Sequence, residues 1–211
     1  MEPLDRHIVV LTWLLRGIED LFVAFSKFDQ SFSRYRSFLN AMGFEMIAKA
    51  YIFAMCPNEY EGLQENQAIF KIDELGRKYG HDPKKLIELI EVSIGEDKMA
   101  KILKTNYDGF NGHQFLDVIK AAYLESRYPV PNPIHENFPH PKYKNLYWEP
   151  LFSSGLEKFC FAFSREVILS LKDDFGISLT TSMLQERVAG EAATRFYNLF
   201  FEGRINDYVL N

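Results

Sequence analysis

The stretch that decides the fold of this chain reads GFEMIAKAYI and runs from Gly43 to Ile52. It lies within a longer helical pattern that Ser31 or Ser33 can cap and that Pro57 stops after about Met55. Apolar side chains recur there at three- and four-residue steps, the spacing of one helix face: Tyr35, Phe38, Leu39, Met42, Met46, Ile47, Ala50 and Tyr51. The pattern predicts an amphipathic helix with one face buried.

Helical periodicity also dominates the rest of the chain, and few stretches alternate as a strand would. Asp82-Pro83 predicts a helix start, with Asp82 as the N-cap and Pro83 in the first helical position. Gly80 is the expected stop of the helix before it. We expect the remaining helices over residues 4–27, 65–79, 96–104, 110–128, 153–173 and 180–203. The chain is therefore predicted to be all-α.

We expect four parts that together form a single domain. Residues 1–30 form a helix that packs on the core, residues 31–130 are the helical core, and residues 151–211 are a helical pair that completes the domain. Between them, residues 131–150 form an arm rich in proline and aromatic residues. Six of the nine prolines lie within residues 129–150, so this stretch cannot be helical. We expect it to pack on the bundle or on a second subunit.

Composition excludes several classes of protein. The 211 residues carry a net charge of −5, and no region is strongly basic, which argues against a broad nucleic-acid footprint. The only two cysteines make no disulfide framework and no metal-binding spacing with histidine, so we expect a cytoplasmic protein without a cofactor. The apolar run Ile8–Leu15 is too short to span a bilayer, so no membrane association is predicted.

Two polar groups lie within or beside the apolar patterns. Glu45 and Lys49 are four residues apart, in the favourable order for a helical ion pair, and form either a solvated pair or the wall of a groove. His81 precedes a helix N-terminus, where backbone N–H groups with Lys84 and Lys85 nearby would suit a phosphate. The alternative is that His81 belongs only to the helix cap.

A third polar group follows one face of the helix expected at 110–128. His113, Asp117, Lys120 and Arg127 are separated by steps of four, three and seven residues, and Glu125 and Tyr128 lie at the end of the same helix. This face is either solvated or an anion-binding surface. His113 and Asp117 alone are too few ligands to indicate a metal site.

In this order and spacing, three segments resemble the HEPN family, helical proteins named for higher eukaryotes and prokaryotes nucleotide-binding. The segments are EMIAKAY at 45–51, HDPKKL at 81–86 and YLESRYP at 123–129. The resemblance covers roughly residues 31–130. It implies an up-and-down bundle, here with extra N- and C-terminal helices, that binds nucleotide or RNA. It also implies a homodimer and, often, a nucleotidyltransferase partner in a toxin–antitoxin pair.

One branch of that family cleaves RNA without metal, using an arginine followed after four to six residues by a histidine. Here three residues separate Arg77 from His81, and seven separate Arg127 from His135, so neither pair fits. The resemblance therefore favours binding of nucleotide, RNA or a protein partner without catalysis. The candidate ligand-binding residues are Glu45, Lys49, His81, Lys84, His113, Asp117, Lys120, Glu125, Arg127 and Tyr128.

Two alternatives remain open. The first is an RNase toxin in which Arg127 works with a histidine from elsewhere, such as His81 or His113. The second is a structural bundle that binds a partner through the aromatic arm at residues 134–150.

Overall fold

The computed structural model of this chain describes residues 5–27, 33–127 and 154–211. Its elements are α1 (Arg6–Lys27), α2 (Ser33–Met55), η2 (Pro57–Glu59), α3 (Glu65–Tyr79), α4 (Pro83–Ile94), α5 (Glu96–Lys104), β1 (Asn106–Tyr107), β2 (Phe110–Asn111), α6 (Gly112–Arg127), α8 (Gly155–Phe175), β3 (Leu179–Thr180), α9 (Thr181–Arg187), α10 (Ala193–Phe200), α11 (Ile205–Tyr208) and β4 (Val209–Leu210). The predicted all-α class is confirmed. The expected arm at residues 131–150 lies outside the described residues.

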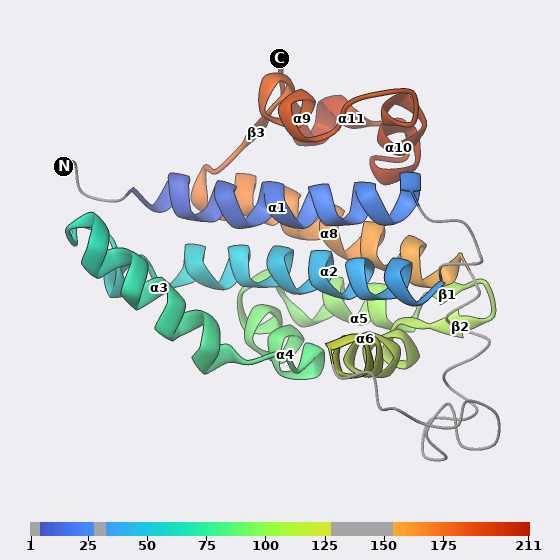
Figure 1. Cartoon of the computed structure of the whole chain (residues 1–211), viewed down its shortest axis with the longest axis horizontal. Helices are drawn as coiled ribbons and strands as arrows, with labels where there is room; N and C mark the ends of the chain where they lie inside the picture. Colours follow the sequence, from blue (N-terminus) through green and yellow to red (C-terminus); the bar gives the residue numbers. More distant parts are fainter. Residues whose placement is uncertain (1–4, 28–32, 128–153) are drawn as a thin grey trace.

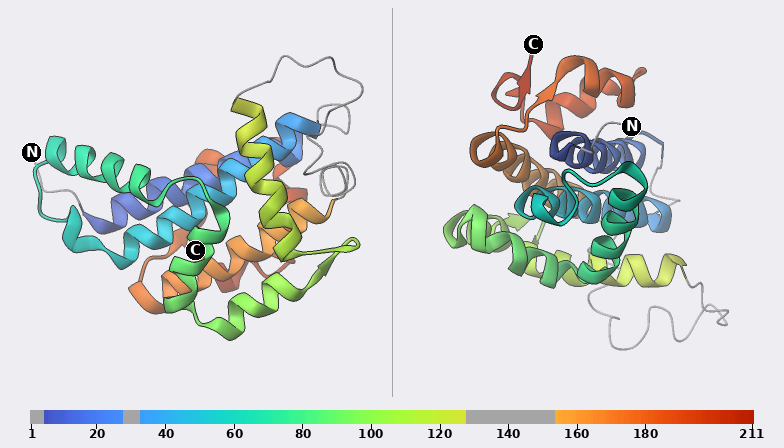
Figure 2. Two further views of the ribbon diagram at one scale, coloured as in Figure 1. Left: turned by 90° about the horizontal axis from the view of Figure 1, so that it is seen from below. Right: turned by 90° about the vertical axis from the view of Figure 1, so that its left-hand side faces the viewer.

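The helix α2 lies in the middle of the molecule. It runs antiparallel to α1 along the longest axis, and it also contacts α4, α6 and α8 (Figure 1). The short helices α9 and α10 pack on α1, and α10 and α11 pack on α8. They form a separate layer on the side of α1 away from α2, which the end-on view also shows (Figure 2). Because α1, α4, α6 and α8 all contact it, α2 is covered on most of its sides.

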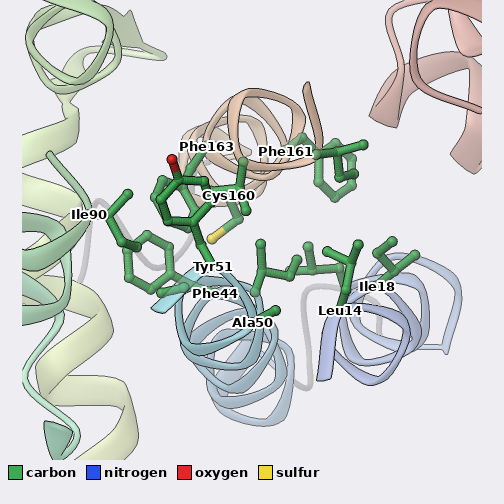
Figure 3. Close-up of a cluster of buried hydrophobic side chains, with 14 of the residues drawn as sticks. Leu14, Ile18, Phe44, Ala50, Tyr51, Ile90, Cys160, Phe161 and Phe163 are labelled. Atoms are coloured by element: carbon green, nitrogen blue, oxygen red, sulfur yellow. The ribbon is translucent and has the colours of Figure 1, made fainter. Parts of the chain in front are cut away.

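The core is built from large apolar side chains of α1, α2, α4 and α8 (Figure 3). On α2, Phe44 is fully buried, and its ring centroid lies 4.3 Å from that of Phe163 on α8. The stretch from Phe159 to Phe163, which is apolar on every side, is buried apart from a half-buried Ala162. Aromatic contacts of this kind stabilise a core beyond the area they remove from water.

The predicted buried stripe of α2 is wrong in its first half. Tyr35 is 62% exposed and Phe38 and Met42 are only half-buried, whereas the polar residues Ser37 and Asn40 are buried. Further along, every residue from 47 to 54 is buried. A single apolar stripe is expected for a helix that is solvated on its opposite face. Because α2 contacts α1, α4, α6 and α8, its burial does not follow one stripe.

In α3, Ile72 and Tyr79 are partly buried against the core. Ile69 is 54% exposed, while Ala68, Leu75 and Gly76 are buried. The start of α4 is as predicted: the Asp82 side chain accepts a hydrogen bond from the Lys84 backbone N–H, and Pro83 is the first helical residue.

Two further expectations are corrected. Before α6, the chain forms an antiparallel hairpin of β1 and β2, and Asp108 and Gly109 take positive φ angles of 56° and 95° in its turn. The helix expected over residues 180–203 is two helices, α9 and α10, separated around Gly190, which has a φ of 95°. Its apolar positions Leu184, Val188, Phe196 and Phe200 are nonetheless buried.

Within the described residues, no helix is both long and apolar enough to cross a membrane.

The helices α1 and α2 approach each other closely at two glycines. A Cβ added to Gly43 would lie 2.8 Å from the Gly17 carbonyl oxygen and 2.7 Å from the Leu21 side chain. A Cβ on Gly17 would lie 2.6 Å from Ile47. Real Cβ atoms do not come this close to a backbone oxygen. The absence of a Cβ at Gly17 and Gly43 therefore allows the two helices to approach this closely.

We predict that Gly43→Ala lowers the free energy of unfolding by about 1–3 kcal/mol, because the new methyl group forces α1 and α2 apart. Gly76→Ala is the matched control, since a Cβ there would meet nothing nearer than the Trp13 ring at 3.7 Å. The control should leave stability unchanged or raise it by up to about 1 kcal/mol through helix propensity. Urea denaturation followed by circular dichroism measures both, and equal stabilities would contradict the close approach.

Candidate ligand-binding site

The three segments singled out in the sequence meet at the imidazole of His81. Its Nδ1 lies 2.9 Å from Glu45 Oε1 and 3.0 Å from Glu45 Oε2. Its Nε2 lies 3.1 Å from the hydroxyl of Tyr123, and the two rings stack with centroids 4.4 Å apart. One residue from α2, one from the α3–α4 turn and one from α6 therefore form a single hydrogen-bonded group.

Glu45 and Lys49 form an ion pair inside the protein. They lie one turn apart on α2, Lys49 Nζ donates to Glu45 Oε1 at 2.7 Å, and the residues are only 5% and 2% exposed. Of the two alternatives for this pair, the solvated one is wrong, because α2 is surrounded by other helices. Taking two charges out of water costs several kcal/mol per ion unless each is fully hydrogen-bonded.

Lys49 has hydrogen-bonding capacity to spare. Its ammonium group has three N–H donors, and Glu45 is the only acceptor that it contacts among the described residues. The ammonium also lies 6.0 Å from the centroid of the Trp13 ring, within reach of a cation–π interaction. A buried ammonium in this state favours a ligand or water that supplies further acceptors.

A pocket of about 440 Å³ opens beside this pair. Its walls are mostly apolar or aromatic, and charged groups lie at its floor and rim: Trp13, Phe38, Met42, Glu45, Met46, Lys49, Asp73, Gly76, Arg77, His81 and Tyr123 line it. At the rim, Arg77 pairs with Asp73 at 2.6 Å, and the Arg77 side chain is 80% exposed. Apolar walls with a few convergent polar groups are typical of sites for small molecules.

Next to the pocket, the start of α4 is tied to α6 by two ion pairs. Lys120 Nζ lies 2.7 Å from Asp82 Oδ2, and Lys84 Nζ lies 2.7 Å from Asp117 Oδ1. Burial alone would raise the pKa of Asp82, but the hydrogen bonds from Lys120 and from the Lys84 backbone N–H outweigh it and lower that pKa. The carboxylate of Asp82 thus occupies the helix N-terminus that was expected to suit a phosphate.

The predicted residues fall into four groups. Glu45, Lys49 and His81 line the pocket, and Lys84, Asp117 and Lys120 form the ion pairs beside it. His113 is exposed on α6 and does not line the pocket. The side chains of Glu125 and Arg127, and the whole of Tyr128, lie outside the described residues.

The helix backbone still places Arg127 one turn beyond Tyr123 on α6. In the described part of the chain, no group of three or more His, Cys, Asp or Glu residues could hold a metal ion.

Sequence reasoning missed several lining residues. Trp13 comes from α1, which lies outside the family resemblance, and Asp73 and Arg77 come from α3, where they resemble an ordinary exposed pair. The available signal was the row Phe38, Met42 and Met46, whose four-residue spacing places all three on one side of α2. These three side chains form one wall of the pocket, and Phe38 and Met42 also pack against the core.

Comparisons with protein-family models, curated proteins and solved structures found no match to this chain.

We predict that Glu45→Gln or Lys49→Met alone lowers the free energy of unfolding by about 3–5 kcal/mol, because each leaves a buried charge without its counter-ion. The double variant should lose less than the sum of the two, giving a coupling energy of at least about 1 kcal/mol. Urea denaturation of all four proteins measures the cycle.

The matched control is the exposed pair Asp73–Arg77, which has the same four-residue spacing. Asp73→Asn and Arg77→Gln should each change stability by less than about 1 kcal/mol. Additive losses in the Glu45–Lys49 cycle would show that the two charges do not depend on each other.

Proposed function

We propose that this chain is a non-catalytic, HEPN-like binding protein whose pocket at His81 takes a nucleotide, either free or within single-stranded RNA. One observation carries the proposal: the segments with the family resemblance supply Glu45, His81 and Tyr123 to one hydrogen-bonded group beside a pocket. The rest of the proposal rests on what that pocket offers a ligand.

The pocket offers flat faces and hydrogen-bond donors, which together suit a nucleobase. Trp13, His81 and Tyr123 line it with three rings, and a base stacked on an aromatic side chain gains about 1–3 kcal/mol. The unused donors of Lys49 would meet the carbonyl oxygen or ring nitrogen acceptors of a base. The Lys49 ammonium is buried, so a ligand without hydrogen-bond acceptors would leave its remaining N–H donors unsatisfied.

The rim offers a cation for the phosphate. Arg77 is exposed and, in the part of the chain that the structure describes, pairs only with Asp73, one turn away on the same helix; such surface pairs contribute little. A phosphate could therefore displace Asp73 from the Arg77 guanidinium with little loss of free energy, and accept two parallel hydrogen bonds from it. Lys84 and Lys120 are less suited, because each is already engaged with a carboxylate of a neighbouring helix.

The homodimer and the nucleotidyltransferase-type partner belong to this proposal only through the family resemblance. The third possibility, a structural bundle that binds a partner through residues 134–150, concerns a segment outside the described residues.

Binding is predicted to quench the fluorescence of Trp13. The chain has two tryptophans, so Trp148→Phe leaves Trp13 as the only indole. Titrating this variant with AMP, GMP, CMP, UMP and a single-stranded RNA hexamer should give saturable quenching with at least one of them. Adding Arg77→Gln should weaken binding at least about fivefold, since a charge-assisted hydrogen bond contributes about 1.5–3 kcal/mol.

The control for that titration is Arg187→Gln, which removes an exposed arginine of α9 that does not line the pocket. It should bind like the parent. Absence of both quenching and calorimetric heat with every nucleotide and with the hexamer would reject the proposal.

One observation favours the RNase alternative. His81 is oriented by a carboxylate at Nδ1, which is how a general base is commonly held, and it stacks on the residue one turn before Arg127. If this group is catalytic, the chain cleaves tRNA in the presence of a chelator, and both His81→Ala and Arg127→Ala abolish cleavage. Products resolved on a denaturing gel test this, and equal patterns for the parent and both variants would dismiss it.

A further inference from the structure

The helix α10 covers the C-terminal end of α1 (Figure 1). Residues of both helices line a second pocket. Its volume is about 650 Å³, and among the described residues it has no lining residue in common with the pocket at His81. Its apolar walls are formed by Phe25 of α1, Tyr107 of β1, Phe161 of α8 and Leu199 of α10. The sequence pattern predicts one helix over residues 180–203 rather than a separate α10, so it does not indicate this site.

Cations outnumber carboxylates by one around this second pocket in the described part of the chain. Four cations line it, namely Arg36, Lys158, Arg165 and Arg195, against the two carboxylates Glu157 and Glu202. Asp108, which lies 2.6 Å from Lys158, is a third carboxylate near its edge. Positive groups still outnumber negative ones in a chain whose net charge is −5, so this is a local concentration of positive charge.

Two of the arginines are fixed in place by other parts of the fold. Arg36 of α2 donates to Glu157 of α8 at 2.7 Å. Arg165, whose side chain is 13% exposed, donates to the carbonyl oxygen of Phe200 at 2.7 Å and to the carboxylate of Glu202. Glu202 has a φ of 52°, a conformation that is uncommon for a residue with a side chain. The guanidinium groups are therefore ordered before any ligand arrives, which lowers the entropy lost on binding.

Arg195 completes the group from α10. Its guanidinium lies over the ring of Phe25, 5.4 Å from the centroid, and it contacts no carboxylate within the described part of the chain. An exposed guanidinium held against an aromatic wall, next to two others, leaves a positive charge available to a ligand.

We propose that this second pocket binds a small phosphate monoester whose aromatic part packs against Phe25 and Phe161. Guanidinium groups from α2, α8 and α10 line this pocket, and that of Arg195, which has no carboxylate partner among the described residues, keeps its donors for the oxygens of a phosphate dianion. The aromatic walls supply the apolar contact. This inference is independent of the nucleotide proposed at His81, because the two pockets share no residue.

Isothermal titration calorimetry at low salt tests it with three probes: phenyl phosphate, inorganic phosphate and benzoate. We expect phenyl phosphate to bind most tightly. Arg195→Gln should weaken that binding at least tenfold, because among the described residues it removes the one lining cation without a carboxylate partner and leaves no carboxylate unpaired. Arg187→Gln, an exposed arginine outside both pockets, and Arg77→Gln, at the rim of the His81 pocket, should bind phenyl phosphate like the parent.

Several results would overturn the proposal. One is no binding of phenyl phosphate to the parent, and another is unchanged binding in Arg195→Gln. Benzoate binding as tightly as phenyl phosphate would reject the assignment to phosphate, and inorganic phosphate binding as tightly would reject the aromatic contact. Arg195 is exposed, so its replacement should leave the helical circular dichroism spectrum unchanged.

Discussion

The ion pair between Glu45 and Lys49 is the interaction on which the rest of this account depends. Two charges buried in the middle of α2 lose their hydration, so each depends on hydrogen-bond partners that the surrounding structure supplies. His81 provides a second hydrogen bond to Glu45, and the Trp13 ring faces Lys49. The remaining donors of Lys49 are the part that the described protein does not satisfy, and they lie where the pocket opens.

The surrounding structure holds these groups in register. The Gly17–Gly43 approach brings α1, and with it Trp13, close to α2. On the other side, the pairs Asp82–Lys120 and Lys84–Asp117 tie the start of α4 to α6. Because His81 directly precedes that start, the two pairs keep its ring against Tyr123. The charges expected to bind an anion are thus engaged in positioning the imidazole.

Much of the fold could be predicted from local signals, and much of the site could not. Asp82-Pro83 and Gly80 place the boundary between α3 and α4, because caps are set by neighbouring residues. The burial of Glu45 and Lys49 escaped prediction because periodicity does not tell how many helices surround a given helix. The Asp108-Gly109 pair is a local sequence signal for a β-hairpin turn, and it accounts for the strands that replace the expected start of the helix at residue 110. Trp13 was unforeseeable as a lining residue, since only tertiary packing brings α1 to the pocket.

The hydrogen bond between His81 and Glu45 is the most direct test that the three segments meet. Long-range proton–nitrogen NMR of the imidazole at neutral pH locates its proton, and His81→Gln assigns the signal among the five histidines. The account predicts a proton on Nδ1 whose chemical shift moves when Glu45 is replaced by Gln. A neutral ring with its proton on Nε2, unaffected by that replacement, would contradict it.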